Sequence, residues 1–236
     1  MLKRFFEHLN HFGGDYSESA ENVTWLQLHG LQGVRSLLDA WPDLHDITSQ
    51  PIAFVAKNAE ESVVNLHNQS MFAVAGGLID KIVCDMASTG SYTLQLTNCR
   101  NRIALLAALA QCRFADGSIT AYWRDEKHLL LHIVTTSSAS QFPRYQLSKL
   151  SESAEEQLNV ATLICSPLQN NGIDTIPVVL TENVVLDIGG AELASRYEQS
   201  LQDGIEIDES EFASICKIAD RVLVEATEQS RQGAGE

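Results

Sequence analysis

Three side chains spaced four residues apart near the N-terminus, Glu21, Trp25 and His29, suggest a first kind of chemistry. Residues four apart share one face of an α-helix, so a carboxylate, an indole and an imidazole would point the same way. Glu21 and His29 are therefore candidate catalytic residues, as a general acid/base pair. The alternative is structural: Trp25 belongs to the core, while Glu21 and His29 make ordinary hydrogen bonds or caps. An imidazole directly before Gly30 is also favourable at a helix C-terminus.

A second group of polar residues lies near the C-terminus, in the run Ser-Arg-Gln-Gly-Ala-Gly from residue 230 to 235. The glycines leave the backbone uncovered, so that successive N–H groups can converge on an anion beside a bidentate guanidinium. This pattern predicts a site for a small carboxylate, amino acid or phosphate, formed by Ser230, Arg231, Gly233 and Gly235. The alternative is that the segment is a disordered chain end.

Other motifs of known chemistry are missing from the sequence. It has no H-E-x-x-H or C-x-x-C pair, and His128 and His132 would be roughly 13 Å apart in a predicted strand. The phosphate-binding loop, the dinucleotide pattern G-x-G-x-x-G and the G-x-S-x-G elbow do not occur. We therefore expect no metal and no cofactor. Arg100 and Arg102 lie just before a predicted helix and are a weak candidate for binding an anion at its N-terminus. The favoured interpretation is that both are solvated surface residues.

The charge balance limits the classes of partner. The sequence has 31 acidic residues against 16 Lys and Arg, a net charge of -15. Such a surface repels phosphate backbones and anionic lipid head groups, which argues against nucleic acid and membrane partners. A balance of this kind is also common in bacterial proteins, where it aids solubility.

The cysteines and the apolar stretches indicate a soluble cytoplasmic protein. Five widely spaced cysteines without a C-x-x-C pair are typical of reduced thiols. Polar residues interrupt the first fourteen positions, where a secretion signal needs an apolar core. The most apolar stretch, 71–86, is short and contains three charged residues, so we expect no membrane span.

The first forty residues predict three short helices. Apolar residues recur at helical spacing over 2–12, and Gly13-Gly14 would end that helix. A second helix is expected from Ser17 or Ser19 to Gly30, and a third from 34 to Pro42.

The middle of the sequence predicts a mixture of strands and helices. A helix-rich stretch is expected over 59–86, with Gly76-Gly77 bending it or admitting another backbone, and a short helix is expected over 102–112. The clearest pattern is a hairpin of 118–125 and 127–136. Further strands are expected at 52–55, 91–97, 159–166, 175–180 and 183–188.

These elements favour an α+β fold, with a helical N-terminus, a mixed and largely antiparallel sheet in the middle and a long C-terminal helix. Residues 1–236 are expected to form a single domain, with a surface loop or a crossing between two lobes near 137–156. The last helix would start at an Asp208 cap, with Glu211 completing a capping box. Its apolar stripe from Phe212 to Ala226 predicts that it packs on the body of the protein.

Both ends of the sequence resemble a bacterial protein family of unknown activity. Its N-terminal pattern G-x-G, A-E-E and W-L-x-x-H-G-L-x-G is similar to Gly13-Gly14, Ala20-Glu21, Trp25-Leu26 and the segment 29–33. Its closing pattern Y-V-P-A-[ST]-E-x-S-R-x-x-G-A-G is similar to residues 221–235. Glu225 replaces the family's usual proline, so the helix need not break there.

Two hypotheses follow from these observations. The first is a metabolic enzyme, or an enzyme subunit, that binds a small anionic metabolite at the C-terminal segment, near Glu21 and His29 if the two ends meet. The second is a non-catalytic module that docks on a partner subunit or forms a homodimer, the commonest oligomer. Polar, glycine-rich segments suit a ligand site better than a dry interface, which favours the first hypothesis.

Overall fold

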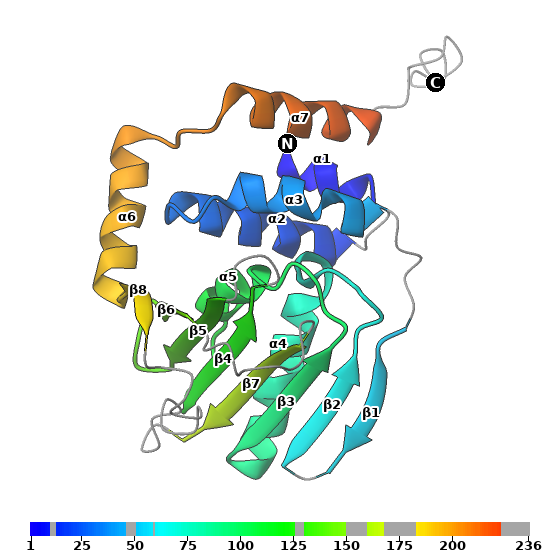
Figure 1. The fold of residues 1–236 in the computed structure, drawn as a ribbon, viewed down its shortest axis with the longest axis vertical. Helices are drawn as coiled ribbons and strands as arrows, with labels where there is room; N and C mark the ends of the chain where they lie inside the picture. The colour runs from blue at the N-terminus through cyan, green and yellow to red at the C-terminus, as the bar shows by residue number, and fades with distance from the viewer. Residues whose placement is uncertain are drawn as a thin grey trace, which may run out of the picture.

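A computed structural model describes residues 1–9, 13–45, 51–58, 60–125, 130–149, 160–167 and 183–222 of the chain. Its described elements form a mixed sheet covered on one face by helices, with a second helical layer beyond them (Figure 1). This arrangement confirms the predicted α+β fold with a helical N-terminal part and a mixed, largely antiparallel sheet.

The described strands form one eight-stranded sheet in the order β1-β2-β3-β7-β4-β5-β6-β8. Strands β2 and β3 pair in parallel, and the other neighbours pair antiparallel. Residues alternate between the two faces, so that in β3 Tyr92, Leu94 and Leu96 are buried under the helices. The strands are β1 (Ala53–Lys57), β2 (Glu61–Asn65), β3 (Tyr92–Thr97), β4 (Ser118–Arg124), β5 (Leu130–Ser137), β6 (Arg144–Lys149), β7 (Val160–Ser166) and β8 (Val184–Ile188).

The helices pack on one face of the sheet and on one another. Helices α4 (Met71–Thr89) and α5 (Ala104–Gln111) cover the sheet, and α2 (Gly13–Leu28) packs on both of them. Helices α1 (Leu2–Glu7) and α3 (Gly33–His45) pack on α2. Helix α6 (Gly190–Asp203) runs from the end of β8 to α7 (Glu209–Ala219), which lies across α1 and α3 (Figure 1). The core between these layers is apolar.

Two glycines set the junction between α2 and α3. Gly30 has φ +69°, the left-handed conformation that ends many helices, as the sequence predicts. Gly33 lies so close to α2 that an added Cβ would overlap the main-chain oxygen of Val23 and lie 2.8 Å from the main-chain nitrogen of Gln27. The absence of a side chain at Gly33 therefore lets α3 cross α2 directly after the turn.

Most predicted elements are present in the described residues. The helices at both ends, the hairpin of β4 and β5, and strands β1, β3, β7 and β8 are confirmed. Gly76 lets another group approach α4 closely, as predicted, but this group is the Glu18 carboxylate and not another backbone. Asp208 caps α7 by accepting hydrogen bonds from the main-chain nitrogens of Ser210 and Glu211. The strand expected at 175–180 lies outside the described residues.

Several boundaries differ from the sequence-based expectation. Helix α3, predicted to end at Pro42, continues through it to His45. Residues 61–65 form β2 rather than helix, because they pair with β3. The helix expected from residue 59 therefore starts later, as α4, after the Ser70 cap. Residues 144–149 form β6 between β5 and β8, where the sequence predicted a surface loop. Gly13 and Gly14, expected to end the first helix, are the first residues of α2.

Helix α7 is shorter than predicted, since it ends at Ala219 and a 3-10 turn follows (Asp220–Val222). Its buried residues are Ile215, Ile218 and Ala219, whereas Phe212 is 49% exposed. The predicted packing of the last helix on the body is confirmed, through α1 and α3. No described helix combines the length and the apolarity that crossing a bilayer requires.

Candidate functional site

Helix α2 carries both catalytic candidates, but it presents them to different surroundings. Glu21 is exposed, and His29 is 1% exposed. The eight residues between them correspond to about 12 Å along the helix axis. The structure therefore does not bring Glu21 and His29 together as one acid/base pair, and each must be considered with its own neighbours.

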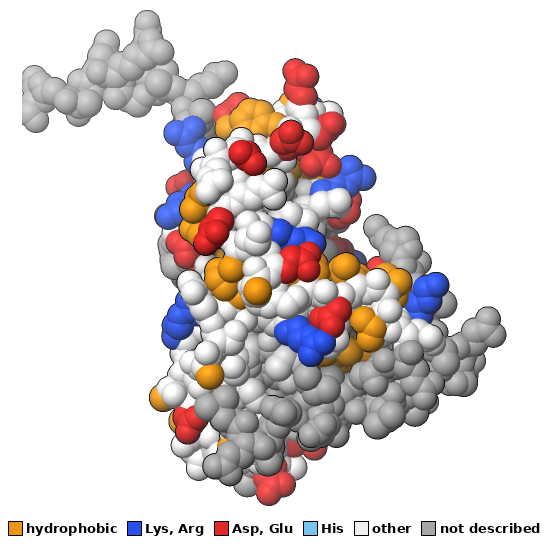
Figure 2. Space-filling view, turned by 90° about the vertical axis from the view of Figure 1, so that its left-hand side faces the viewer, with side chains coloured by type: hydrophobic (Ala, Val, Ile, Leu, Met, Phe, Trp, Pro, Cys, Tyr) orange, Lys and Arg blue, Asp and Glu red, His pale blue; other side chains and the backbone are white. Residues whose placement is uncertain are grey.

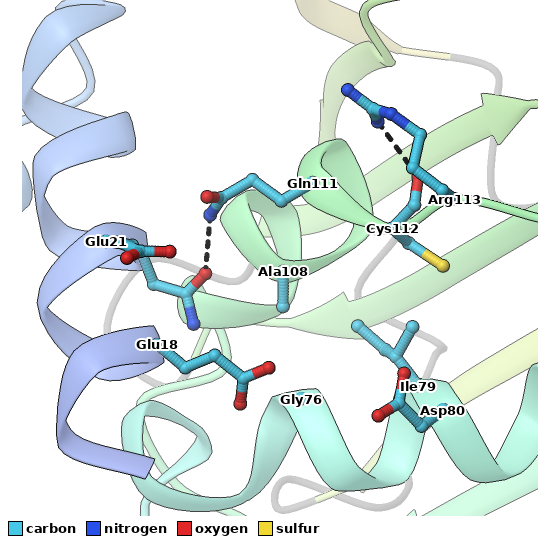
Figure 3. A pocket seen from close by; sticks show the side chains of 10 residues that line it. Glu18, Glu21, Gly76, Ile79, Asp80, Ala108, Gln111, Cys112 and Arg113 are labelled. Atoms are coloured by element: carbon cyan, nitrogen blue, oxygen red, sulfur yellow. Dashed lines mark hydrogen bonds between the residues drawn. The ribbon is translucent and has the colours of Figure 1, made fainter. Parts of the chain in front are cut away.

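Glu21 lines a pocket of about 420 Å³ between α2, α4 and α5 (Figure 3). This volume lies within the range of small-molecule sites. The close-up shows polar side chains of all three helices around a lining that also contains Ile79 and Ala108. The lining residues are Glu18, Glu21, Asn22, Gly76, Ile79, Asp80, Ala108, Gln111, Cys112 and Arg113.

A hydrogen bond between α2 and α5 crosses one side of this pocket. Nε2 of Gln111 donates to Oδ1 of Asn22 at 2.8 Å (Figure 3). Asn22 is only 4% exposed, so its amide is held in one orientation by burial as well as by this bond. The side chain of Gln111 is further fixed by the main-chain oxygen of Ala107, at 3.3 Å.

The charge of the pocket is negative. Glu18, Glu21 and Asp80 contribute three carboxylates, against the single guanidinium of Arg113. Nη1 of Arg113 donates to the main-chain oxygens of Ala110 and Cys112, at 3.2 and 3.0 Å. A pocket of this charge repels an anionic metabolite. The predicted anionic ligand therefore does not belong between α2, α4 and α5.

Cys112 lines the same pocket but is a poor nucleophile. Burial raises the pKa of its thiol to about 11, and the nearby Asp80 carboxylate acts in the same direction. The thiolate is the reactive form of cysteine, and it is scarce near neutral pH at such a value.

His29 lies in an aromatic cluster where α2 meets α6. Its ring stacks on Trp25 with the centroids 3.9 Å apart and on Tyr197 of α6 at 5.5 Å, and Phe142 lies at 5.6 Å. Nδ1 of His29 is 2.7 Å from the main-chain oxygen of Trp25. A carbonyl oxygen only accepts, so Nδ1 is the donor and carries the proton.

The other ring nitrogen of His29 is not satisfied within the described ranges. Nε2 is buried and makes no hydrogen bond to any residue that the structure describes. Burial lowers the pKa of His29 below its usual value, and the Arg196 guanidinium lowers it further, although the bond to Trp25 opposes them. The imidazole is therefore neutral at pH 7, with its lone pair on Nε2. A buried acceptor without a partner costs stability and calls for an explanation.

Helix α6 contributes polar contacts to the end of α2. Nη1 of Arg196 donates to the main-chain oxygen of His29 at 3.5 Å, and Oγ of Ser200 donates to that of Leu28 at 2.7 Å. The last carbonyls of a helix lack partners within it, so these bonds cap α2. They also place a guanidinium, on a side chain that is 33% exposed, beside the His29 cluster.

A second cavity, about 450 Å³, is an apolar groove between α1, α2 and the start of α7. Its lining includes Leu2, Ala20, Ile207, Phe212 and Ile215, and Glu21 reaches its edge. The groove and the packing of α7 on α1 show that the N-terminal helices and the last described helix lie together.

The four ligand-binding candidates of the C-terminal segment, Ser230, Arg231, Gly233 and Gly235, lie outside the described residues. The weaker anion candidate before α5 is not available. Arg100 pairs with Asp43, and Arg102 is buried, with Nη1 and Nη2 donating to the main-chain oxygens of Cys99 and Arg124. The interpretation of both arginines as solvated is thus wrong for Arg102. In the described ranges no group of three or more His, Cys, Asp or Glu side chains is arranged to hold a metal ion.

Sequence reasoning missed the partners of both candidates. Asn22 and Gln111 have no local motif, because they meet only when α2 packs on α5. Arg196 and Tyr197 are likewise brought to His29 from a helix near the other end of the chain. Asn22 lies four residues after Glu18, on the same helix face, and this spacing was an available indication of a polar face there.

No model of a protein family and no curated protein matches the sequence. Solved structures do resemble the fold. A dehydrogenase from Sinorhizobium meliloti is 11% identical, with a TM-score of 0.65 over 92% of this chain and 96% of that one. Malate dehydrogenase from Pyrococcus horikoshii is 11% identical, with a TM-score of 0.61 over 95% and 93%. Sulfolactate dehydrogenase from Methanocaldococcus jannaschii is 10% identical, with a TM-score of 0.60 over 94% of each chain. At these identities the likeness shows a shared fold.

Proposed function

We propose that this chain is a metabolic enzyme, or a subunit of one, that binds a small carboxylate metabolite where α2 meets α6. In this proposal Nε2 of His29 accepts a proton from, or returns it to, a hydroxyl group of the ligand. Glu21, about 12 Å away along the axis of α2, takes no part in this step.

The observation that carries the proposal is the buried Nε2 of His29, which has no partner in the part of the chain that the structure describes. The bond from Nδ1 to Trp25 fixes the tautomer, and burial keeps the ring neutral. A neutral imidazole with a fixed tautomer and an available lone pair is the form that general base catalysis requires. Tyr197 covers the ring, so a ligand reaches Nε2 only when α6 moves outward.

Arg196 is the described cation best placed to bind the carboxylate. Its Nη2 is bound to Glu192 one turn earlier in α6, at 2.6 Å. An exposed pair of this kind is worth only about 0.3–0.5 kcal/mol, so a ligand carboxylate can replace Glu192 at little cost. The C-terminal segment with Ser230, Arg231, Gly233 and Gly235 remains our prediction for a further anion contact.

The likeness to known folds supports the class of ligand. The similar structures include dehydrogenases of malate and sulfolactate, which are small anions with a hydroxyl group. A delta1-piperideine-2-carboxylate reductase is similar as well, with a TM-score of 0.52 and 7% identity. Malate and sulfolactate offer a carboxylate to Arg196 and a hydroxyl to His29, whereas piperideine-2-carboxylate offers the carboxylate alone. Membership of the bacterial family that both ends resemble is a separate prediction.

The described cavities do not fit the carrier that dehydrogenases use. Such enzymes exchange hydride with a bound dinucleotide, whose pyrophosphate needs cations or helix N-termini. The 420 Å³ pocket has three carboxylates, and the groove beside α7 is apolar apart from Lys3, Glu21 and Thr24. We therefore derive no hydride-transfer step. The chemistry assigned to this chain is ligand binding and proton transfer at His29.

A thermal-shift panel tests this function. L-malate, L-lactate, oxaloacetate and pyruvate are added to the wild type and to Arg196→Ala, with Glu198→Ala on the same helix as a control. At least one acid is expected to raise the Tm of the wild type and of Glu198→Ala, and to do so less for Arg196→Ala. Arg231→Ala tests the C-terminal contact separately. No shift with any acid, or an equal shift in all four proteins, would contradict the proposal.

The alternative, a non-catalytic docking module, is favoured by apolar side chains exposed from α6 to α7. Leu201, Ile205, Ile207 and Phe212 are all more than one third exposed. Figure 2 shows apolar side chains among charged ones on the face of the molecule that carries α6. Sedimentation equilibrium of the wild type and Phe212→Ser distinguishes this function, which predicts a dimer that the substitution dissociates.

A further inference from the structure

We infer that the ligand of the His29 site is a 2-hydroxy acid with an aromatic side chain, such as 3-phenyllactate, in preference to a small dicarboxylate. The ring of the ligand takes the stacking position against His29 that the ring of Tyr197 now holds. This inference rests on the proposed function and deepens it, because it names the side chain of the ligand, whereas that function requires only a carboxylate and a hydroxyl group.

Aromatic rings from three segments of the chain surround the imidazole of His29. Trp25 lies one turn earlier in α2, Phe142 precedes β6, and Tyr197 belongs to α6. The rings of Trp25 and Tyr197 stack on His29 with interplanar angles of 22° and 18°, and that of Phe142 is tilted by 57°. Such rings make favourable contacts with a further aromatic ring. The ligand hydroxyl that binds Nε2 therefore enters surroundings that favour an aromatic group beside it.

The charge beside His29 suits a ligand with a single carboxylate. Nη1 of Arg196 donates to the main-chain oxygen of His29 at 3.5 Å, and its Nη2 is bound to Glu192, which a ligand carboxylate can replace. The contacts described for His29 include no second cation. The second carboxylate of malate would thus lie beside aromatic rings, where an unpaired charge is costly. An aromatic side chain at the same place carries no charge.

Helix α6 is anchored at its start and can open beyond it (Figure 1). Of its residues, all of which the structure describes, only Leu193 is buried, in the first turn. At the other end α6 stops at Gly204, which has φ +86° and open space around it. Between these points the half-buried ring of Tyr197 contacts His29. A pivot about the first turn therefore lifts Tyr197 from His29 while Leu193 stays in the core, at the cost of the bond from Ser200 to α2.

The position that Tyr197 leaves lies next to the two polar contacts of the ligand. Arg196 and Tyr197 are adjacent in α6, and both reach His29. A 2-hydroxy-3-aryl acid carries its carboxylate, its hydroxyl and its arylmethyl group on one carbon atom. Arg196, Nε2 of His29 and the vacated ring position receive these three groups in turn. The ligand ring also restores the stacking contact that His29 loses when α6 opens.

Isothermal titration calorimetry with four acids tests the ligand class: L-3-phenyllactate, L-lactate, L-malate and 3-phenylpropionate. Phenyllactate is expected to bind at least about tenfold more tightly than lactate and malate, because of its buried and stacked ring. Phenylpropionate lacks only the hydroxyl, so it should bind about fivefold more weakly than phenyllactate. This last acid separates the site from a general attraction of aromatic acids to exposed apolar side chains.

Two variants test the position of the ligand ring. Tyr197→Ala removes the ring that competes with the ligand and is expected to tighten the binding of phenyllactate at least about threefold. The binding of lactate should tighten less, because lactate has no ring to fill the space. Tyr197→Phe keeps the competing ring and should not tighten the binding of either acid. Circular dichroism of each variant shows whether the fold is retained.

The outcomes separate this inference from the proposed function. Equal affinities of the wild type for phenyllactate and lactate would overturn the inference alone, and so would weaker binding of phenyllactate to Tyr197→Ala than to the wild type. Absence of binding by all four acids, or binding that Arg196→Ala does not weaken, would contradict the proposed function as well. Equal affinities for phenylpropionate and phenyllactate would also contradict both, since His29 would then receive no hydroxyl.

Discussion

Nδ1 of His29 donates a hydrogen bond to the main-chain oxygen of Trp25, one turn earlier in α2, at 2.7 Å. This bond fixes the proton on Nδ1 and leaves Nε2 as a buried acceptor without a partner among the described residues. The His29 side chain thus keeps Nε2 away from water, which costs stability. The contacts of its ring with Trp25 and Tyr197 do not need this polar atom. Such local costs are typical of functional positions.

His29→Phe is expected to leave the free energy of unfolding within about 1 kcal/mol of the wild type, or to raise it. The ring contacts with Trp25 and Tyr197 remain, and the lost bond to Trp25 is offset because the unpartnered Nε2 is removed. Urea unfolding measures this difference. A loss of 3 kcal/mol or more would indicate that His29 is a structural residue.

Stability is expected to fall as the pH decreases from about 6.5 to 4. Burial lowers the pKa of His132 to about 4, and burial also lowers that of His29. The unfolded chain, with histidine pKa values near 6.5, binds more protons in this window, so acid favours unfolding.

His132→Phe isolates the larger of these contributions. The substitution retains the stacking of an aromatic ring on Trp123 and removes the titrating group. Between pH 7 and 4.5 the wild type should lose about 2–3 kcal/mol more than the variant, measured by urea unfolding at both pH values. Equal losses would show that His132 is protonated as readily in the folded protein as in the unfolded chain.

Ser200→Ala is expected to loosen α6. The substitution removes the bond from Oγ to the main-chain oxygen of Leu28, worth about 1 kcal/mol. Amide hydrogen exchange in 190–203 should accelerate about fivefold, while exchange in α4 stays unchanged. Uniform acceleration in both helices would mean that α6 opens only with global unfolding.

Gly33→Ala is expected to destabilise the protein by about 2 kcal/mol or more. The added methyl group would overlap main-chain atoms of α2, which cannot move aside as a flexible side chain can. Gly77→Ala, with open space around it, should be neutral or stabilising by up to about 1 kcal/mol, since alanine is the better helix former. Thermal unfolding of the two variants provides the comparison. Equal Tm values would contradict the tight crossing of α2 and α3.

Local sequence patterns predicted much of the fold. Alternating residues on both sides of 126–129 predict the hairpin of β4 and β5, and Asp208 predicts the start of α7. Both features could be predicted because they depend on residues close together in the sequence. Strand β2 was missed because it depends on pairing with β3, and the helical spacing of the following residues obscured it. The polar composition around β6 similarly hid a strand that pairs on both sides.

The candidate sites were less predictable, because long-range contacts form them. His29 and Glu21 could be singled out by type and spacing, but spacing alone did not show that one is buried and the other exposed. Asn22 and Gln111 are 89 residues apart, and His29 and Arg196 are 167 apart. Only the packing of α2 against α5 and α6 joins them.

The protonation state of His29 is the most direct test of this account, and long-range ¹H–¹⁵N NMR of the histidine rings measures it. We predict a neutral ring with the proton on Nδ1 at pH 7, and an Nε2 resonance that shifts when an acid that stabilises the protein, such as L-malate, is added. A proton on Nε2, or an Nε2 resonance that no acid of the panel displaces, would contradict it.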